Sequence, residues 1–393
     1  MTDLLRTDFT GLSFPNPFIL ASAPPTRTGD MIKRAFEAGW GGAATKTIGL
    51  QGAVNVRPRF GFLKERSRIV GMTNFELISE KGLDHWVDEI ADIKAAFPDR
   101  PLIASIMGSV EPTDWEILAK AVQAAGADAI ELNVSCPHGM PEQHMGAFMG
   151  QDPALIKMAT AAVAGASSVP VWVKLTPNVT DIAAMSLAAK EAGADAVAAI
   201  NTVAGLVGID IETFRPVPSV AGRSAYGGYS GQGVKPVALR AVSSIAATSK
   251  LPVSGCGGIT TWEDAAEFML AGAGTLQVCT AVMLNGYGII DVFVRGLSEY
   301  LERKGFDSYA SAVGRSLPMI GEFSALDPHV GAHAVVDPEA CNGCGNCVPA
   351  CGDGGFQAIV MCGKVAVVDS ELCDGCSLCE SVCRVSAVSM VRG

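Results

Sequence analysis

Eight of the 12 cysteines in this 393-residue chain lie between Cys341 and Cys383. They form two runs of the same spacing, Cys341-x2-Cys344-x2-Cys347-x3-Cys351 and Cys373-x2-Cys376-x2-Cys379-x3-Cys383. Cysteines at this spacing are ligands of 4Fe–4S clusters, because a tight loop supplies three thiolates and a distant cysteine supplies the fourth. The two runs therefore predict two such clusters and electron transfer through this part of the chain.

The tandem arrangement also predicts which cysteines share a cluster, because in two-cluster bacterial ferredoxins the fourth cysteine of each run binds the other cluster. The ligands of cluster 1 are then Cys341, Cys344, Cys347 and Cys383, and those of cluster 2 are Cys373, Cys376, Cys379 and Cys351. Zinc sites usually show two separated C-x2-C pairs, and disulfides need an oxidising compartment, so both alternatives are disfavoured. The proline that usually follows the fourth cysteine is Gly352 or Arg384 here, a change that removes no ligand.

Composition limits the class of protein. With 49% hydrophobic residues, 18% charged residues and 44 glycines, the chain can form one large α/β core and a small additional domain. A net charge of −11 would repel nucleic acid and anionic membranes. No charge-free apolar stretch has the length of a signal peptide or a membrane span. We therefore expect a cytoplasmic protein that binds neither nucleic acid nor membranes.

A repeated junction organises the chain up to about residue 320: an apparent helix ends in Ala-Gly, at Gly39, Gly126, Gly193 and Gly272, and an apolar segment follows. Glycine after a helix adopts the left-handed cap conformation at little cost. Eight strand-like segments can be counted, at residues 18–22, 42–46, 102–107, 129–133, 171–175, 196–201, 252–256 and 275–279. Eight βα units predict a TIM barrel, and a doubly wound sheet is the less favoured alternative.

These patterns divide the chain into three predicted parts. Residues 1–320 form an α/β TIM barrel, residues 321–334 a linker, and residues 335–393 a small α+β domain like a bacterial ferredoxin. No G-x-G-x-x-G sequence opens a helix after a strand, so we do not expect the chain itself to bind NAD(P)H.

Polar residues stand where several of the predicted strands end, the place where TIM barrels carry their active sites. Lys46 and Lys174 end apolar strands, a costly position for a lysine unless it meets an anion or an acceptor. Either lysine alone could be solvated at a loop, but together with Asn133 and Asn201 they favour a shared ligand.

Glycines and a threonine end the last two predicted strands, at Gly257, Gly258 and Thr280. Many barrels bind a phosphate at this position, through backbone N–H groups that glycine lets approach closely. A phosphate site beside lysines in an iron–sulfur protein suggests FMN, because a flavin can exchange a hydride for single electrons.

The loop after the fourth predicted strand carries a candidate acid, Cys136, next to Ser135, Pro137 and His138. On such a polar loop a thiol could give or take a proton beside a flavin. Free cysteines are more often buried and inert, which is our interpretation of Cys256 and Cys279.

Five segments resemble dihydropyrimidine dehydrogenase: Asn74–Lys81, Asn133–Met140, Lys174–Asp181, Asn201–Val203 and Tyr226–Gly231. The resemblance covers nearly the whole chain and is to the FMN barrel with its C-terminal ferredoxin portion, which in bacteria is a separate subunit. The FAD- and NADPH-binding half of the animal enzyme is missing. The resemblance therefore implies a partner flavoprotein that binds FAD and NAD(P)H, and a homodimeric core within a hetero-oligomer.

The resemblance also implies roles for individual residues. Cys136 would be the general acid that protonates C5 of uracil or thymine while flavin N5 gives a hydride to C6, and a positioned acid contributes about 10² to 10⁴ in rate. Pyrimidine-binding positions are matched by Asn74, Asn133, Ser135, Asn201 and Thr202. FMN-binding positions are matched by Ser22, Lys46, Thr47, Lys174, Gly231, Cys256, Gly257, Gly258, Cys279 and Thr280, with Cys256 standing where the animal enzyme has threonine.

We therefore expect a subunit with FMN and two 4Fe–4S clusters that reduces uracil or thymine to the 5,6-dihydro form. One alternative is an enzyme similar to dihydroorotate dehydrogenase that acts on orotate or a related cyclic amide. The other is an electron-transfer flavin subunit without pyrimidine turnover. The physiological direction, the preferred pyrimidine and the choice between NADH and NADPH stay open.

Overall fold

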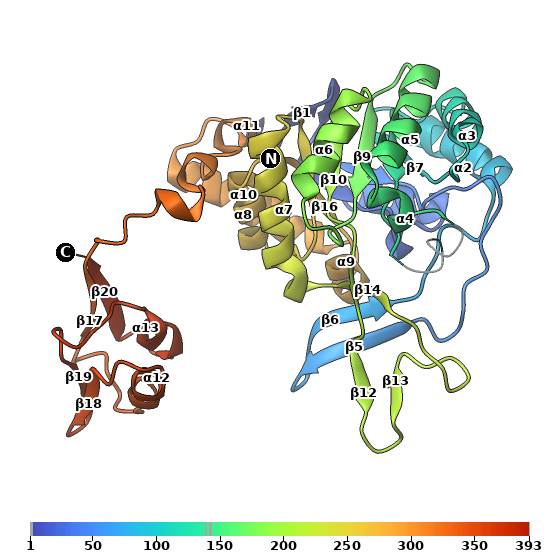
Figure 1. Ribbon diagram of the computed structural model, residues 1–393. Helices are drawn as coiled ribbons and strands as arrows, with labels where there is room; N and C mark the ends of the chain where they lie inside the picture. The colour runs from blue at the N-terminus through green and yellow to red at the C-terminus, as the bar shows by residue number, and fades with distance from the viewer. Residues whose placement is uncertain (1–2, 138–139, 141–143, 393) are drawn as a thin grey trace. The chain divides into compact units, whose positions relative to one another are not determined.

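The computed structural model describes residues 3–137, 140 and 144–392 of the chain (Figure 1). It divides into two compact units, residues 1–320 and residues 321–393. The segment predicted as a linker, residues 321–334, belongs to the second unit, and its last residues already form part of strand β17 (Ala332–Val336).

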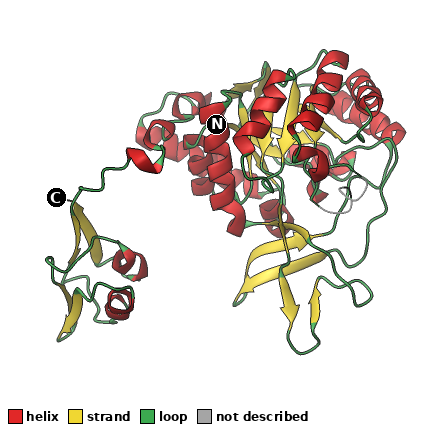
Figure 2. Ribbon diagram, in the orientation of Figure 1, coloured by secondary structure: helices red, strands yellow, loops and turns green. Residues whose placement is uncertain are grey.

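A closed barrel of eight parallel strands forms the centre of the first unit (Figure 2). In chain order these strands are β3 (Phe18–Leu20), β4 (Gly42–Ala44), β7 (Leu102–Ile106), β8 (Ala129–Asn133), β9 (Val171–Leu175), β10 (Ala196–Ala199), β15 (Val253–Cys256) and β16 (Ala273–Val278). The pairing of β16 with β3 closes the barrel, with Leu276 opposite Phe18. All eight predicted strands are present, and the predicted TIM barrel is confirmed.

Helices surround the barrel: α1 (Gly29–Glu37), α2 (Leu83–Ala96), α3 (Pro112–Ala124), α5 (Pro153–Ala166), α6 (Ile182–Glu191), α7 (Lys235–Thr248), α8 (Trp262–Leu270) and α10 (Ile289–Lys304). Shorter helices are α4 (Ala147–Gly150), α9 (Thr280–Asn285) and α11 (Tyr309–Ala312). The four Ala-Gly junctions behave as predicted, because Gly39, Gly126, Gly193 and Gly272 all have positive φ angles, between 97° and 107°. No helix in the described part of the chain is long and apolar enough to cross a membrane.

An N-terminal hairpin packs against the start of the barrel strands. Strands β1 (Thr7–Phe9) and β2 (Leu12–Phe14) pair antiparallel, and Phe9 and Phe14 are buried with a layer of apolar side chains from six barrel strands. The ring of Phe9 meets that of Trp172 edge-on at 5.0 Å, and Trp172 Nε1 donates a hydrogen bond to Thr10 Oγ1 at 3.0 Å. The amino end of the barrel is therefore filled by side chains.

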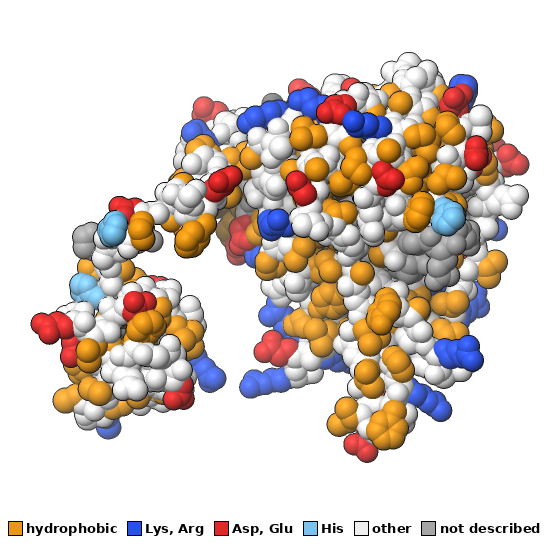
Figure 3. Space-filling model, viewed as in Figure 1, with side chains coloured by type: hydrophobic (Ala, Val, Ile, Leu, Met, Phe, Trp, Pro, Cys, Tyr) orange, Lys and Arg blue, Asp and Glu red, His pale blue; other side chains and the backbone are white. Residues whose placement is uncertain are grey.

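Two loops after barrel strands form additional β structure that the sequence patterns did not predict. Strands β5 (Phe60–Glu65), β6 (Arg68–Asn74), β11 (Val203–Gly205) and β14 (Gly227–Ser230) form an antiparallel sheet in the order β11-β14-β6-β5. Strands β12 (Gly208–Asp210) and β13 (Arg215–Val217) form a hairpin with exposed apolar side chains at Ile209, Ile211 and Phe214 (Figure 3). The sheet places Asn74 opposite Gly228.

The second unit is a small α+β domain with an internal repeat, as predicted. Strand β17 pairs with β20 (Val388–Arg392), and β18 (Ile359–Cys362) pairs with β19 (Val365–Val368). Helix α12 (Cys347–Asp353) begins at the third cysteine of the first run, and helix α13 (Leu378–Val382) begins one residue before the third cysteine of the second run. Its core cluster consists of the buried residues Ala334, Ile359, Ala366 and Val388 together with Cys347 and Cys379.

Candidate active site and cluster sites

The carboxyl ends of the barrel strands surround a cavity of about 1040 Å³. Its wall includes every residue predicted to bind pyrimidine or FMN or to act as the acid, except Ser135. Ser135 is fully buried directly behind this wall and is hydrogen-bonded to two residues that line it. The fold therefore brings the whole predicted set together, from positions between residues 22 and 280 of the sequence.

A chain of hydrogen bonds links four strand ends along one wall of the cavity. Asn201 Nδ2 donates to Ser135 Oγ at 2.8 Å, and Ser135 Oγ donates to Asn133 Oδ1 at 2.9 Å. Asn133 Nδ2 donates to Thr47 Oγ1 at 2.9 Å, and the Thr47 and Ser22 hydroxyl oxygens lie 2.9 Å apart. These bonds fix the orientation of both amides, and each amide keeps one N–H for a ligand. Asn201 Oδ1 also keeps a lone pair, whereas Asn133 Oδ1 already accepts from both the N–H and the hydroxyl of Ser135.

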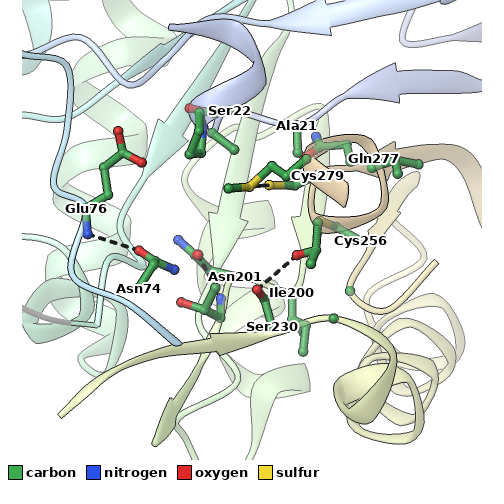
Figure 4. A pocket seen from close by; sticks show the side chains of 18 of the residues that line it. Ala21, Ser22, Asn74, Glu76, Ile200, Asn201, Ser230, Cys256, Gln277 and Cys279 are labelled. Carbon is green, nitrogen blue, oxygen red and sulfur yellow. Dashed lines mark hydrogen bonds between the residues drawn. The ribbon is translucent and has the colours of Figure 1, made fainter. Parts of the chain in front are cut away.

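The additional sheet contributes a second group of polar side chains, and Figure 4 shows Asn74 and Glu76 on the opposite side of the cavity from Cys256 and Cys279. Asn74 Nδ2 donates to the Gly228 carbonyl at 3.1 Å, and the Glu76 N–H donates to Asn74 Oδ1 at 3.2 Å. Glu76 Oε1 lies 3.9 Å from Lys46 Nζ, and both side chains are buried. Burial lowers the pKa of Lys46 below its ordinary value, although the Glu76 charge acts in the other direction.

The second predicted lysine, Lys174, lies in a different polar group inside the barrel. Lys174 Nζ donates to Gln277 Oε1 at 2.5 Å and lies 3.8 Å from Cys256 Sγ. Gln277 Nε2 in turn donates to Glu131 Oε2 at 2.6 Å. Burial would lower the pKa of Lys174, but the Cys256 sulfur and the Glu131 carboxylate more than offset this effect and raise it.

Glycines shape the rim of the cavity next to the start of α7. Gly257 and Gly258 have φ angles of +122° and +85°. A Cβ atom on Gly258 would lie 2.7 Å from the backbone nitrogen of Lys235, and one on Gly257 would lie 2.8 Å from the Cβ of Ala238. Thr280 Oγ1 donates to Ser230 Oγ at 2.9 Å nearby on the same cavity wall. Only backbone without side chains fits here, an arrangement that suits the close approach of a phosphate group.

Cys136 lies on the cavity wall, and its side chain belongs to a small apolar cluster with Ile78, Met107 and Met140. The Cys136 carbonyl accepts a hydrogen bond from the Ala147 N–H at 2.9 Å. His138, which the sequence places beside it, lies outside the described residues. The thiol therefore lines the cavity from within this cluster.

In the second unit, a cavity of about 340 Å³ is lined by Cys341, Cys344, Cys347 and Cys383, the set predicted for cluster 1. Cys379 lies close enough to Cys373 and Cys376 for their charges to contribute, after burial, to its raised pKa. Among the described residues, no three potential ligands are near enough to hold a single metal ion.

Backbone N–H groups point at three of the predicted cluster ligands. Ala387 N donates to Cys383 Sγ at 3.2 Å, Ala358 N to Cys351 Sγ at 3.3 Å and Ala334 N to Cys373 Sγ at 3.4 Å. Hydrogen bonds of this kind stabilise thiolates and contribute to the potential of a cluster.

Three residues of the site were missed from the sequence: Glu76 and Gln277, which line the cavity, and Glu131, which contacts Gln277. A signal existed for each. Glu76 lies inside one of the segments that resemble dihydropyrimidine dehydrogenase, and Glu131 and Gln277 are polar residues in otherwise apolar strands, as Lys174 is.

Comparison with known proteins gives two family matches. Residues 4–301 match the dihydroorotate dehydrogenase family, and residues 334–390 match the 4Fe–4S dicluster domain. Each match lies within one of the two units of the fold.

The relatives of this chain include proteins named as dihydropyrimidine dehydrogenases and proteins named as dihydroorotate dehydrogenases. The chain is 44% identical over 363 residues to the NAD-dependent dihydropyrimidine dehydrogenase subunit PreA of Escherichia coli strain K12, which covers 91% of this chain and 88% of that one. It is 41% identical to the chloroplastic dihydropyrimidine dehydrogenase (NADP(+)) of Arabidopsis thaliana, over 80% of this chain and 77% of that one. It is 42% identical to the catalytic subunit of dihydroorotate dehydrogenase B (NAD(+)) of Pyrococcus abyssi, over 80% of this chain and 99% of that one.

These matches confirm the resemblance found in the sequence and extend it to the related dihydroorotate dehydrogenases. The chain belongs to the dihydroorotate dehydrogenase family and combines the barrel of that family with a 4Fe–4S dicluster domain.

Proposed function

We propose that this chain is the flavin and iron–sulfur subunit of an NAD(P)H-dependent dihydropyrimidine dehydrogenase, which reduces uracil or thymine to the 5,6-dihydro compound. The observation that carries this proposal is the content of the cavity. Three asparagine amides, a thiol in an apolar environment and a lysine whose charge is balanced by a carboxylate line the same space.

The amides suit a pyrimidine ring. Uracil and thymine present alternating C=O and N–H groups. Asn74 and Asn201 can each offer a donor and an acceptor, and Asn133 can offer a donor. Orotate carries a carboxylate in addition, which needs an available cation. Lys46 is paired with Glu76, so the negative charge of Glu76 favours a neutral ring over orotate.

The cavity also fits FMN. The glycine rim accommodates a phosphate, and Lys174 supplies a buried cation suited to the negative charge of a reduced flavin ring. Bound there, FMN would supply the hydride for C6 of the pyrimidine. Cys136, on the same cavity wall, would deliver the proton that C5 requires.

Electrons would reach this subunit through two 4Fe–4S clusters, cluster 1 on Cys341, Cys344, Cys347 and Cys383 and cluster 2 on Cys373, Cys376, Cys379 and Cys351. A partner subunit that binds FAD and NAD(P)H would be their source. Support comes from the name of the Escherichia coli relative, an NAD-dependent dehydrogenase subunit, and from the missing dinucleotide fingerprint in this chain.

The test is anaerobic purification followed by iron and flavin assays and turnover with a chemical electron donor. We expect about eight irons and one FMN per chain, with reduction of uracil or thymine much faster than that of orotate. Faster orotate reduction would support the dihydroorotate dehydrogenase alternative, which the Pyrococcus abyssi relative keeps open. A protein with FMN and clusters that reduces none of these rings would be an electron-transfer subunit instead.

A further inference from the structure

Glu131 is a carboxylate in the middle of the barrel. It lies on β8, points into the barrel interior with Lys174 of β9 and Gln277 of β16, and is fully buried. Its Oε2 accepts one hydrogen bond from Gln277, while Oε1 has no hydrogen-bond partner among the described residues. The nearest cation is Lys174, whose Nζ lies 4.0 Å from Oε1.

This buried carboxylate is not expected to stabilise the folded protein. A buried carboxylate loses its hydration, and an ion pair with an unsatisfied oxygen does not recover that loss. Apolar residues of similar size in a barrel interior usually give a folded protein of equal or greater stability. A role in the chemistry of the cavity explains why a charge lies here.

Gln277 connects the carboxylate to the lysine. Its Oε1 accepts from Lys174 and its Nε2 donates to Glu131, so the reversed amide would point N–H groups at the ammonium and an oxygen at the carboxylate. The two bonds thus fix the amide and hold the ammonium group at one side of the cavity that Lys174 lines.

The other titratable groups near Lys174 do not provide the balancing charge. Cys256 on β15 lies 3.8 Å from Nζ, and Cys279 follows β16. Burial raises the pKa of Cys256, and it raises the pKa of Cys279 to about 12, so both are neutral thiols near pH 7. The effect of the Cys256 sulfur on the pKa of Lys174 belongs to the higher pH at which that thiol ionises, which leaves the Glu131 carboxylate as the balancing charge near pH 7. Within β10, the other strand beside β9, the residues Ala196–Ala199 are apolar. Lys46 is a like charge, and its own carboxylate is Glu76.

We propose that Glu131 and Gln277 are positioning residues that keep Lys174 protonated and directed into the cavity, and that they thereby set the electron affinity of the flavin bound there. The part that concerns the flavin rests on the proposed function. The part that concerns the charge of Lys174 depends only on this chain.

The first experiment measures the charge of Lys174 directly. Full-length protein, with FMN bound and after its release, is labelled with trace acetic anhydride between pH 6 and pH 10, and the Lys174 peptide is quantified by mass spectrometry. In the unaltered protein Lys174 should react slowly up to about pH 9, because only the neutral amine reacts. In Glu131→Gln its labelling at pH 7.5 should be about tenfold faster or more.

The second experiment measures the flavin. The midpoint potential of FMN is followed against pH in the unaltered protein, Glu131→Gln, Lys174→Met and the double variant. Glu131→Gln should take up about one additional proton per flavin on reduction near pH 8, because Lys174 is then neutral beside the oxidised ring and charged beside the reduced one. The double variant should lose this additional uptake.

Asp128→Asn is the matched control. Asp128 directly precedes β8 and pairs with Lys94 at 2.8 Å on the amino side of the barrel, so its removal should leave both readouts unchanged. Labelling of Glu131→Gln equal to that of the unaltered protein would overturn the inference. If the protein binds no FMN, the proposed function fails while the labelling result still decides the role of Glu131.

If Glu131→Gln does not fold, Gln277→Leu removes the connection between the two charges and should accelerate labelling of Lys174 by a smaller factor. Rapid labelling of Lys174 in the unaltered protein at pH 7 would refute the inference without any variant.

Discussion

Lys46 Nζ lies 3.9 Å from Glu76 Oε1 in the wall of the cavity, and both side chains are buried. The two residues come from different parts of the chain, the end of a barrel strand and the end of the additional sheet. We expect this ion pair to be the feature of the cavity that discriminates most between a neutral substrate and an anionic one.

Glu76→Gln should therefore shift substrate preference. Without the carboxylate, an anionic substrate no longer meets the negative charge of Glu76, so the ratio of orotate to uracil kcat/KM should rise by about tenfold. Glu80→Gln is the control, because Glu80 lies in the same segment, is partly exposed and pairs with Arg27 outside the cavity. An unchanged ratio in Glu76→Gln would remove the charge argument for a neutral pyrimidine.

Cys136→Ala should abolish most of the pyrimidine reduction while leaving the cofactors in place. Loss of a positioned acid lowers kcat by about 10² to 10⁴, and FMN and iron contents should equal those of the unaltered protein. Cys362→Ala, an exposed cysteine of the second unit outside both predicted ligand sets, is the control. Undiminished turnover in Cys136→Ala would show that another group delivers the proton.

Gly258→Ala should weaken FMN binding. The φ angle of +85° strains alanine by about 1–2 kcal/mol, and its Cβ would also lie 2.7 Å from the Lys235 nitrogen. Gly286→Ala separates the two effects, because Gly286 has a φ angle of +80° with no atom near the added Cβ. Both variants should lower the free energy of unfolding, but only Gly258→Ala should raise the FMN dissociation constant, by about tenfold or more, in a fluorescence titration. Equal FMN affinities would argue against a phosphate at this rim.

Paired cysteine substitutions test how the clusters are shared. Cys341→Ala with Cys383→Ala removes two predicted ligands of cluster 1, so about four irons should remain. Cys341→Ala with Cys351→Ala removes one ligand from each cluster, and most of the iron should be lost. If each run instead held its own cluster, the two results would be exchanged. Iron assays and electron paramagnetic resonance of the reduced proteins measure the difference.

The sequence was sufficient for the barrel because each strand is a short apolar segment and each Ala-Gly junction needs a left-handed residue. The additional sheet was missed for a physical reason. Its strands are short and contain glycines such as Gly71, Gly205 and Gly228, and their order, β11-β14-β6-β5, joins segments about 150 residues apart. Pairing over such distances has no local pattern.

The candidate site shows the same limit. Residues at the ends of strands could be identified one at a time, because topology alone brings them together. The carboxylates that pair with the two lysines could not be identified in this way. Whether Lys46 pairs with Glu76, or Lys174 with Glu131, depends on side-chain distances inside the closed barrel rather than on spacing along the chain.

The N-terminal hairpin has a consequence for how such a protein can change during evolution. Phe9, Phe14 and Trp172 give the amino end of the barrel its own well-packed apolar layer, far along the strands from the glycine rim and the buried charges of the cavity. Stability and chemistry thus reside at opposite ends of the same strands. Substitutions around the cavity can then alter which ring is accepted while the packed end keeps the variants folded, which suits a scaffold whose relatives carry the names of two different dehydrogenases.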